Sequence, residues 1–142
     1  MIIGIDTNII LNILRADDPI EQLKGSLEFF KRITKRKVEV AISVITLTEL
    51  FRKPFKKRSL EEKKKLDAFL HTLNARIINI DNGSAIEAAR LIEEAGLKFA
   101  DALIASSLLF SGVEIFITRN VKDFKATSLI VQTPEEYLNS RG

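Results

Sequence analysis

The sequence predicts an α/β fold, a single domain in which a parallel sheet of four to five strands is flanked by helices. Three features of the chain predict it. Short runs rich in β-branched residues alternate with longer stretches of helical period. The short runs are mostly apolar throughout instead of alternating, which is typical of strands covered on both faces. Strands separated by helices imply right-handed crossovers, and these give a parallel sheet.

The expected strands are five short apolar segments. They lie at residues 2–5, 38–44, 76–80, 114–118 and 129–131. A helix is expected to start directly after the first strand. Asp18 can cap the next helix, with Pro19 at its first position, and that helix runs to about Lys37. The following helix, 46–53, is expected to stop at Pro54 because proline lacks the amide donor.

Three further helices have recognisable ends. They are expected at 60–73, opened by a capping box of Ser59 and Glu62, at 84–95, ended by Gly96, and at 99–111, ended by Gly112. In the 84–95 segment, small and aliphatic residues share one face, which we expect to pack on the sheet: Ala85, Ala88, Ala89 and Ile92.

Length and composition indicate an ordinary globular protein. At 142 residues the chain fits one domain, residues 1–142, which would bury about 70% of its unfolded surface. Hydrophobic residues make up 46% and charged residues 29%. No apolar run approaches the ~18–20 residues that span a bilayer, and the amino terminus lacks a signal-peptide pattern. We therefore expect a cytoplasmic protein without a membrane partner.

The residue types exclude several kinds of chemistry. The chain has no cysteine, so disulfides, thiolate zinc sites and cysteine nucleophiles are ruled out. Its single histidine, His71, lies in a lysine-rich amphipathic stretch, and we interpret it as a partly exposed helix residue. Any catalysis must therefore use carboxylates, hydroxyls, amides or cations.

Four acidic residues are expected at one edge of the sheet. Asp6 ends the first strand, and Glu49 lies in the first or second turn of the helix that leaves the second strand. Asp101 begins a helix that descends to the start of the fourth strand, so it too lies at the carboxyl edge. Asp123 follows the fourth strand by a few residues. Open α/β sheets build their ligand sites at this edge.

Each of these acids has a plainer interpretation when taken alone. Asp6 and Asp101 suit a helix cap or a first helical turn, while Glu49 and Asp123 suit exposed positions. Together, four carboxylates would repel one another and raise each other's pKa values unless a cation lay among them. A hard divalent metal explains such a cluster, and metal-assisted phosphodiester hydrolysis is the leading hypothesis.

Four motifs follow one another along the chain: Asp6-Thr7-Asn8 after a strand, Thr48-Glu49-Leu50, Ala100-Asp101-Ala102-Leu103-Ile104-Ala105, and Ile117-Thr118-Arg119-Asn120 with Asp123-Phe124. Together they resemble a PIN-domain protein, most closely a VapC-like toxin ribonuclease, over essentially the whole chain. Asp6, Glu49 and Asp101 match the three core acids of that family. Many relatives carry a fourth acid at the position of Asn120, whereas the nearest carboxylate here is Asp123.

The resemblance implies an endoribonuclease that binds Mg²⁺ or Mn²⁺ and cuts RNA. Within it, we assign Asp6 and Asp101 as principal metal ligands and Glu49 as the residue that orients or deprotonates the attacking water. Asp123 would hold a second ion or a metal-bound water. Asn8, Thr118 and Asn120 are expected to support these groups.

The expected partners are RNA, a second copy of the chain and an antitoxin protein. Homodimers and antitoxin-bound dimers are usual in the family that the chain resembles, and segments 9–14 and 27–30 carry much apolar surface. The basic runs 31–37 and 52–58 are either solvated helix ends or contacts to a phosphate backbone. The candidate RNA contacts are Arg15, Lys53, Lys56, Lys57, Arg58 and Arg119.

Other functions stay open. The chain could be a housekeeping PIN nuclease of RNA processing, or a catalytically silent PIN-like module that binds RNA or protein. A receiver-type signalling domain is disfavoured because Asp6 is followed by Thr7 and not by a second acid. A nucleotide-binding ATPase is disfavoured because no glycine-rich phosphate loop is present.

Overall fold

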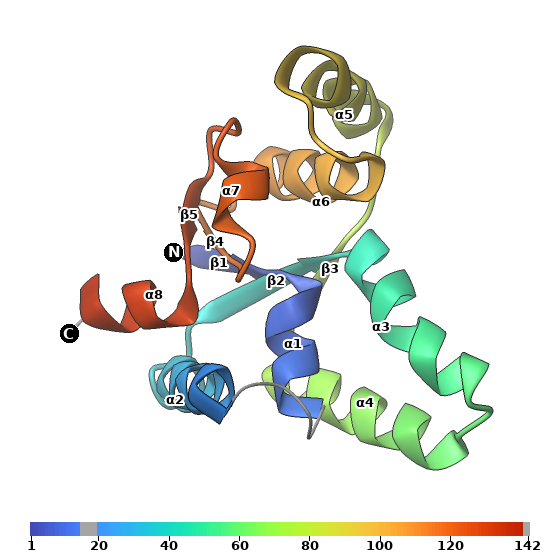
Figure 1. Cartoon of the computed structure of the whole chain (residues 1–142), viewed down its shortest axis with the longest axis vertical. Coiled ribbons are helices and arrows are strands. Elements are labelled where there is room, and N and C mark those ends of the chain that lie inside the picture. The colour runs from blue at the N-terminus through green and yellow to red at the C-terminus, as the bar shows by residue number, and fades with distance from the viewer. Residues whose placement is uncertain (15–19, 141–142) are drawn as a thin grey trace.

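Five short strands pair in parallel into one sheet, in the order β3-β2-β1-β4-β5 (Figure 1). The computed structural model describes residues 1–14 and 20–140. The strands are β1 Ile2–Ile5, β2 Glu39–Ser43, β3 Arg76–Ile78, β4 Ile115–Ile117 and β5 Ile130–Gln132. The parallel sheet and all five strands that the sequence predicts are confirmed, with ends that differ by a few residues.

Helices cover both faces of the sheet. Their bounds are α1 Thr7–Leu14, α2 Ile20–Lys35, α3 Val44–Lys56, α4 Leu60–Leu73, α5 Asn82–Ala95, α6 Phe99–Phe110, α7 Val121–Phe124 and α8 Pro134–Ser140. Figure 1 shows α5 and α6 on one side of the sheet and α1, α2 and α4 on the other. No helix in the described part of the chain has the length and apolar character needed to cross a membrane.

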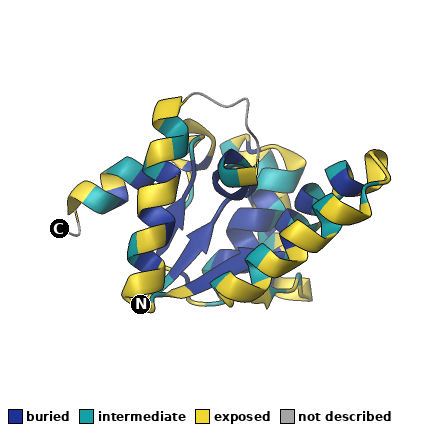
Figure 2. Cartoon of the chain, turned by 90° about the horizontal axis from the view of Figure 1, so that it is seen from below, coloured by how far each residue is buried: buried dark blue, intermediate teal, exposed yellow. Residues whose placement is uncertain are grey.

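Two apolar clusters lie on the two faces of the sheet, and the three central strands, β1, β2 and β4, are largely buried between them (Figure 2). Ile3 and Ile5 of β1 face the cluster formed with α1, α2 and α4. Gly4, between them, faces α6 on the other side. A Cβ added at Gly4 would lie 2.9 Å from Cδ1 of Leu108, so a larger residue there would push α6 away from the central strand.

One predicted helix end and one predicted capping box differ from the structure around the turn between α3 and α4, while α4 has the predicted bounds. Pro54 lies inside α3, because the helix continues for one more turn with the Lys57 amide bonded to the Lys53 carbonyl at 3.0 Å. Ser59 caps α4 by accepting a hydrogen bond from the Glu62 amide at 3.1 Å. The reciprocal half of the capping box is not formed, since the Ser59 amide bonds to Pro54 and the Glu62 carboxylate lies 3.6 Å from Lys57.

The inward face of α5 also differs from the prediction. Asp81 caps this helix, which buries Ser84, Ala88 and Leu91, whereas Ala85 and Ala89 are exposed. Small residues occur on two neighbouring faces of α5, so they do not determine which face packs inward. The larger side chain of Leu91 determines it. The sequence analysis missed α7 and α8, which are short. The proposed cap at Asp18 and Pro19 lies outside the described residues.

Arg119, directly after β4, ties the end of this strand to three helices. Its Nε donates to Oδ1 of Asn12 at 3.2 Å, and one guanidinium nitrogen donates to both Glu135 carboxylate oxygens at 2.6 and 2.7 Å. The other nitrogen donates to the Gln22 carbonyl at 2.8 Å and to the Ser26 hydroxyl at 3.0 Å. The side chain is only 14% exposed. These bonds fix the carboxyl end of β4 against α1, α2 and α8.

We expect Arg119→Ala to lower the free energy of unfolding by about 3 kcal/mol, because it removes several buried hydrogen bonds at once. Urea denaturation measures this. Arg90→Ala is the matched control, since Arg90 pairs with Glu87 and Glu94 on the exposed surface of α5 and should contribute less than about 1 kcal/mol. An equal loss in both variants would contradict a special role for Arg119.

Candidate active site

The four predicted acids lie near the carboxyl ends of β1, β2 and β4. Asp6 follows β1 directly, and Glu49 is in the second turn of α3, which leaves β2. Asp101 is in the first turn of α6, and Asp123 is in α7, just after β4. The chain leaves β1 towards β2 on one side, while β4 pairs with β1 on the other. Asp6 therefore stands at the topological switch point of the sheet, where α/β folds place ligands.

Asp6 is the deepest of these acids and is only 5% exposed. One carboxylate oxygen accepts the Thr7 amide at 2.8 Å, and the other accepts the Thr118 hydroxyl at 2.7 Å. Burial raises the pKa of Asp6 from its ordinary 3.8 to about 6, the two hydrogen bonds oppose the shift, and Asp101 and Glu49 add to it by repulsion. An ionised Asp6 thus lacks compensating positive charge.

Glu49 is held beside Asp6 through a threonine that the sequence analysis did not assign. The Thr7 hydroxyl donates to Oε1 of Glu49 at 2.5 Å and lies 3.4 Å from the Thr46 hydroxyl. Because the Thr7 amide also bonds to Asp6, one residue orients two of the acids. Its place directly after Asp6, in the first turn of a helix that starts at this edge, was the available signal.

Asp101 links the inner acids to the outer one. Its pKa is raised, first by burial, then by repulsion from Asp123 and Glu49, while Lys98 opposes the shift. Asp101 and Asp123 line a hollow of about 170 Å³ together with Lys98 and Lys122. Asp123 is exposed, and its charge raises the pKa of Asp101 but is not among the causes that raise the pKa of Asp6. The inner acids are therefore Asp6, Glu49 and Asp101, with Asp123 at the rim.

The donor set suits a hard cation with a water-rich shell. Among residues 1–14 and 20–140, no three acidic or histidine side chains are arranged so that they could hold one ion between them. Magnesium is usually bound through one or two carboxylates and keeps several waters, so three protein ligands are not required. The buried Asp6 carboxylate, which carries uncompensated charge beside two further carboxylates, fits such an ion.

The three predicted supporting residues contact the site in different ways. Thr118 donates to Asp6 and in turn accepts the Asn120 amide at 3.0 Å. Oδ1 of Asn8 accepts the Arg119 amide at 3.3 Å, which joins the start of α1 to the end of β4. The Asn120 side chain is exposed and does not cap α7. Asp123, three residues later, is the carboxylate that α7 presents to Asp101.

The predicted RNA contacts do not all lie near the acids. Lys53, Lys56 and Lys57 line an open hollow that also contains Glu49, whereas Arg58 follows α3 and is not among its lining residues. Arg119 differs from these lysines, because its guanidinium makes the internal bonds described above and its side chain is only 14% exposed. Arg15 lies outside the described residues. The run 31–37 ends α2 before β2 begins, at the edge of the sheet opposite the acids.

We expect the stability of the metal-free protein to fall as pH rises from about 4 to about 6, and then to level off. Between these pH values the folded state holds the Asp6 proton and the unfolded state releases it, which corresponds to about 3 kcal/mol. Asp6→Asn should remove this fall and be the more stable protein at pH 7. Urea titrations at several pH values measure both effects, with Asp67→Asn, an exposed aspartate of α4, as the control. A fall of equal size in Asp6→Asn would show that another group causes it.

Comparison with solved structures finds the same architecture in toxin–antitoxin complexes. The structure titled VapBC2 from Rickettsia felis bound to a DNA fragment from their promoter has a TM-score of 0.75 at 26% identity, covering 94% of this chain and 98% of that one. A toxin–antitoxin complex from Klebsiella pneumoniae has a TM-score of 0.68 at 29% identity, covering 92% and 96%. FitAcB from Neisseria gonorrhoeae, at 23% identity, TM-score 0.73 and coverage of 94% and 98%, supports the fold alone.

A search of curated proteins finds no significant match. The family model described as the PIN domain matches residues 3–128, which include all four acids. PIN domains are generally nucleases, and this supports a hydrolytic function. The sheet order, the acids at its carboxyl edge and the match over most of the sequence lead to one conclusion: the chain belongs to the PIN domain family.

Proposed function

We propose that this chain is a metal-dependent endoribonuclease and the toxin of a VapBC-like toxin–antitoxin pair. The observation that carries the enzymatic part is the buried Asp6 carboxylate with two half-buried carboxylates, Glu49 and Asp101, close enough to raise its pKa. The observation that favours a toxin is the similarity, over almost the full length of both chains, to structures titled as toxin–antitoxin complexes.

Each acid has a role that follows from its surroundings. Asp6 and Asp101 would hold Mg²⁺ or Mn²⁺, which when bound lowers the pKa of a water and neutralises charge that develops on the phosphate. Glu49, oriented by the Thr7 hydroxyl, is placed to orient or deprotonate the attacking water. Asp123 at the rim would bind a second ion or a metal-bound water. Thr118 keeps the Asp6 carboxylate in position.

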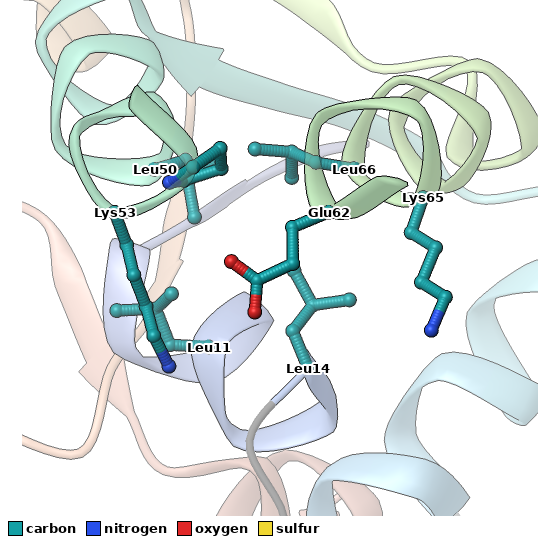
Figure 3. A pocket seen from close by; sticks show the side chains of 8 residues that line it. Leu11, Leu14, Leu50, Lys53, Glu62, Lys65 and Leu66 are labelled. Atoms are coloured by element: carbon teal, nitrogen blue, oxygen red, sulfur yellow. The ribbon is translucent and has the colours of Figure 1, made fainter. Parts of the chain in front are cut away.

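The proposed partners are an antitoxin and a second copy of the chain. A pocket between α1, α3 and α4, shown in Figure 3, is lined by four leucines: Leu11, Leu14, Leu50 and Leu66. Leu50 and Leu66 form its buried floor, whereas Leu14 is 38% exposed and would be covered by an apolar partner segment. The Glu62 carboxylate points into it, and its Oε2 is buried without a hydrogen-bond partner among the described residues. Exposed apolar side chains of α5, such as Ile86, would suit a dimer contact.

One alternative has an observation in its favour. Asn120 stands where many PIN proteins carry an acid, and no group of three acids in the described residues is set up to hold a metal. A catalytically silent module that binds RNA or protein would have the same fold. The two experiments below separate the alternatives.

Asp6→Asn and Asp101→Asn should each lower the rate of metal-dependent RNA cleavage by at least about a hundredfold, because each removes a ligand and the charge neutralisation it supports. Asp123→Asn should cost less, since Asp123 acts from the rim. Cleavage of single-stranded RNA by the purified protein measures the rates, and Asp67→Asn is the control. Expressed alone, the wild type should arrest growth and Asp6→Asn should not. Full cleavage by Asp6→Asn would overturn the mechanism, and cleavage without growth arrest would favour a housekeeping nuclease.

Magnesium or manganese should raise the melting temperature by several degrees, and a chelator should reverse the rise. An ion that binds only the folded state stabilises it by about 2.7 kcal/mol at a hundred times its dissociation constant. Asp6→Asn should lose most of the rise while Asp67→Asn keeps it. Identical melting curves of the wild type with and without millimolar ions would favour the silent module.

A further inference from the structure

The open hollow beside Glu49 combines an aromatic ring with positive charge. It has a volume of about 1180 Å³ and is lined by α3 and its C-cap residue Lys57: Thr48, Glu49, Phe51, Arg52, Lys53, Phe55, Lys56 and Lys57. Seven residues of one helix and its cap thus form a surface that begins at a candidate catalytic acid. The residues of this hollow that the sequence suggested as RNA contacts are lysines, and its aromatic side chains were not among them.

Phe55 is the unusual member of this group, because its side chain is 66% exposed. Single exposed apolar residues are common on protein surfaces and need no explanation by themselves. Phe55, however, lies six residues after Glu49 on the same helix, which is about 9 Å along the axis. Arg52 lies one turn before it and Lys56 directly after it, and both are exposed. An exposed ring between cations, within reach of the acids, is the arrangement that single-stranded nucleic acids bind.

We propose that Phe55 is a base-stacking subsite for an unpaired nucleotide of the substrate strand, with Arg52 and Lys56 contacting the adjoining phosphates. The proposal rests on the proposed nuclease function and adds a stacking residue to the surface that would bind the substrate strand. A base in a duplex is covered on both sides by its neighbours, so it cannot place a face on Phe55. The positive charge also offsets the repulsion between the four acids and a polyanion.

Stacking and phosphate contact have different experimental signatures. Phe55→Ala should weaken binding of a single-stranded RNA octamer at least about fivefold and leave the slope of log K against log salt unchanged. The double variant Arg52→Ala, Lys56→Ala should reduce that slope by about one for each lost phosphate contact. All measurements are made in EDTA, so that no cleavage takes place. Phe110→Ala is the matched control, since Phe110 is 56% exposed at the far end of α6.

A direct probe is available because the chain contains no tryptophan. Phe55→Trp would carry the sole tryptophan, and its emission should be quenched by the RNA octamer but not by an abasic octamer or by duplex RNA. Phe110→Trp should respond to none of them. Melting curves of each variant check that the fold is kept, as expected for an exposed position.

The outcomes distinguish this proposal from the nuclease function. If the wild type binds and cleaves RNA while Phe55→Trp stays silent and Phe55→Ala binds normally, the subsite is overturned and the nuclease function stands. If duplex RNA quenches as strongly as the single strand, the assignment to a single strand is overturned. If Phe55→Ala loses only binding to a co-expressed protein partner, the surface binds protein and the proposal fails. If the octamer quenches Phe55→Trp but the wild type with metal cleaves no RNA, the subsite is supported and the nuclease function is rejected.

Discussion

The burial of the Asp6 carboxylate at the end of the central strand is the constraint on which the site depends. A carboxylate that is 5% exposed must be compensated, and two hydrogen bonds, from the Thr7 amide and the Thr118 hydroxyl, do not keep its pKa at the ordinary value. Glu49 and Asp101 increase the deficit of positive charge. The fold therefore holds a group that is destabilising in isolation, as sites that await a cation do.

The surrounding structure keeps this arrangement rigid. Thr118 reaches Asp6 because β4 pairs with β1, and Arg119, the next residue, anchors the end of β4 to α1, α2 and α8. The Asn8 side chain accepts the Arg119 amide, so the helix that follows Asp6 is joined to the same network. The arginine next to the acids therefore has its guanidinium bonded to the protein itself.

The two sides of the acid cluster differ in what they offer a ligand. On the α3 side, Glu49 opens onto an extended surface with Phe55, Arg52 and Lys56, which suits a chain of nucleotides. On the α6 side, Asp101 and Asp123 face a small hollow between Lys98 and Lys122, which suits a single ion or one phosphate.

The sequence by itself determined the five strands and the longer helices, because apolar runs and capping residues are local signals. It also predicted that Asp6, Glu49, Asp101 and Asp123 lie at one edge, through the rule that parallel strands end together. It did not determine what each polar side chain contacts. The bonds from Arg119 to α2 and α8 were not predictable from its place after β4. Thr7 starts α1 as expected, but the bond from its hydroxyl to Glu49 was not predictable. The continuation of α3 past Pro54 and the choice of the inward face of α5 likewise depend on packing. Hydrogen bonds between residues about 40 to 110 positions apart depend on how the helices pack, and no local pattern encodes them.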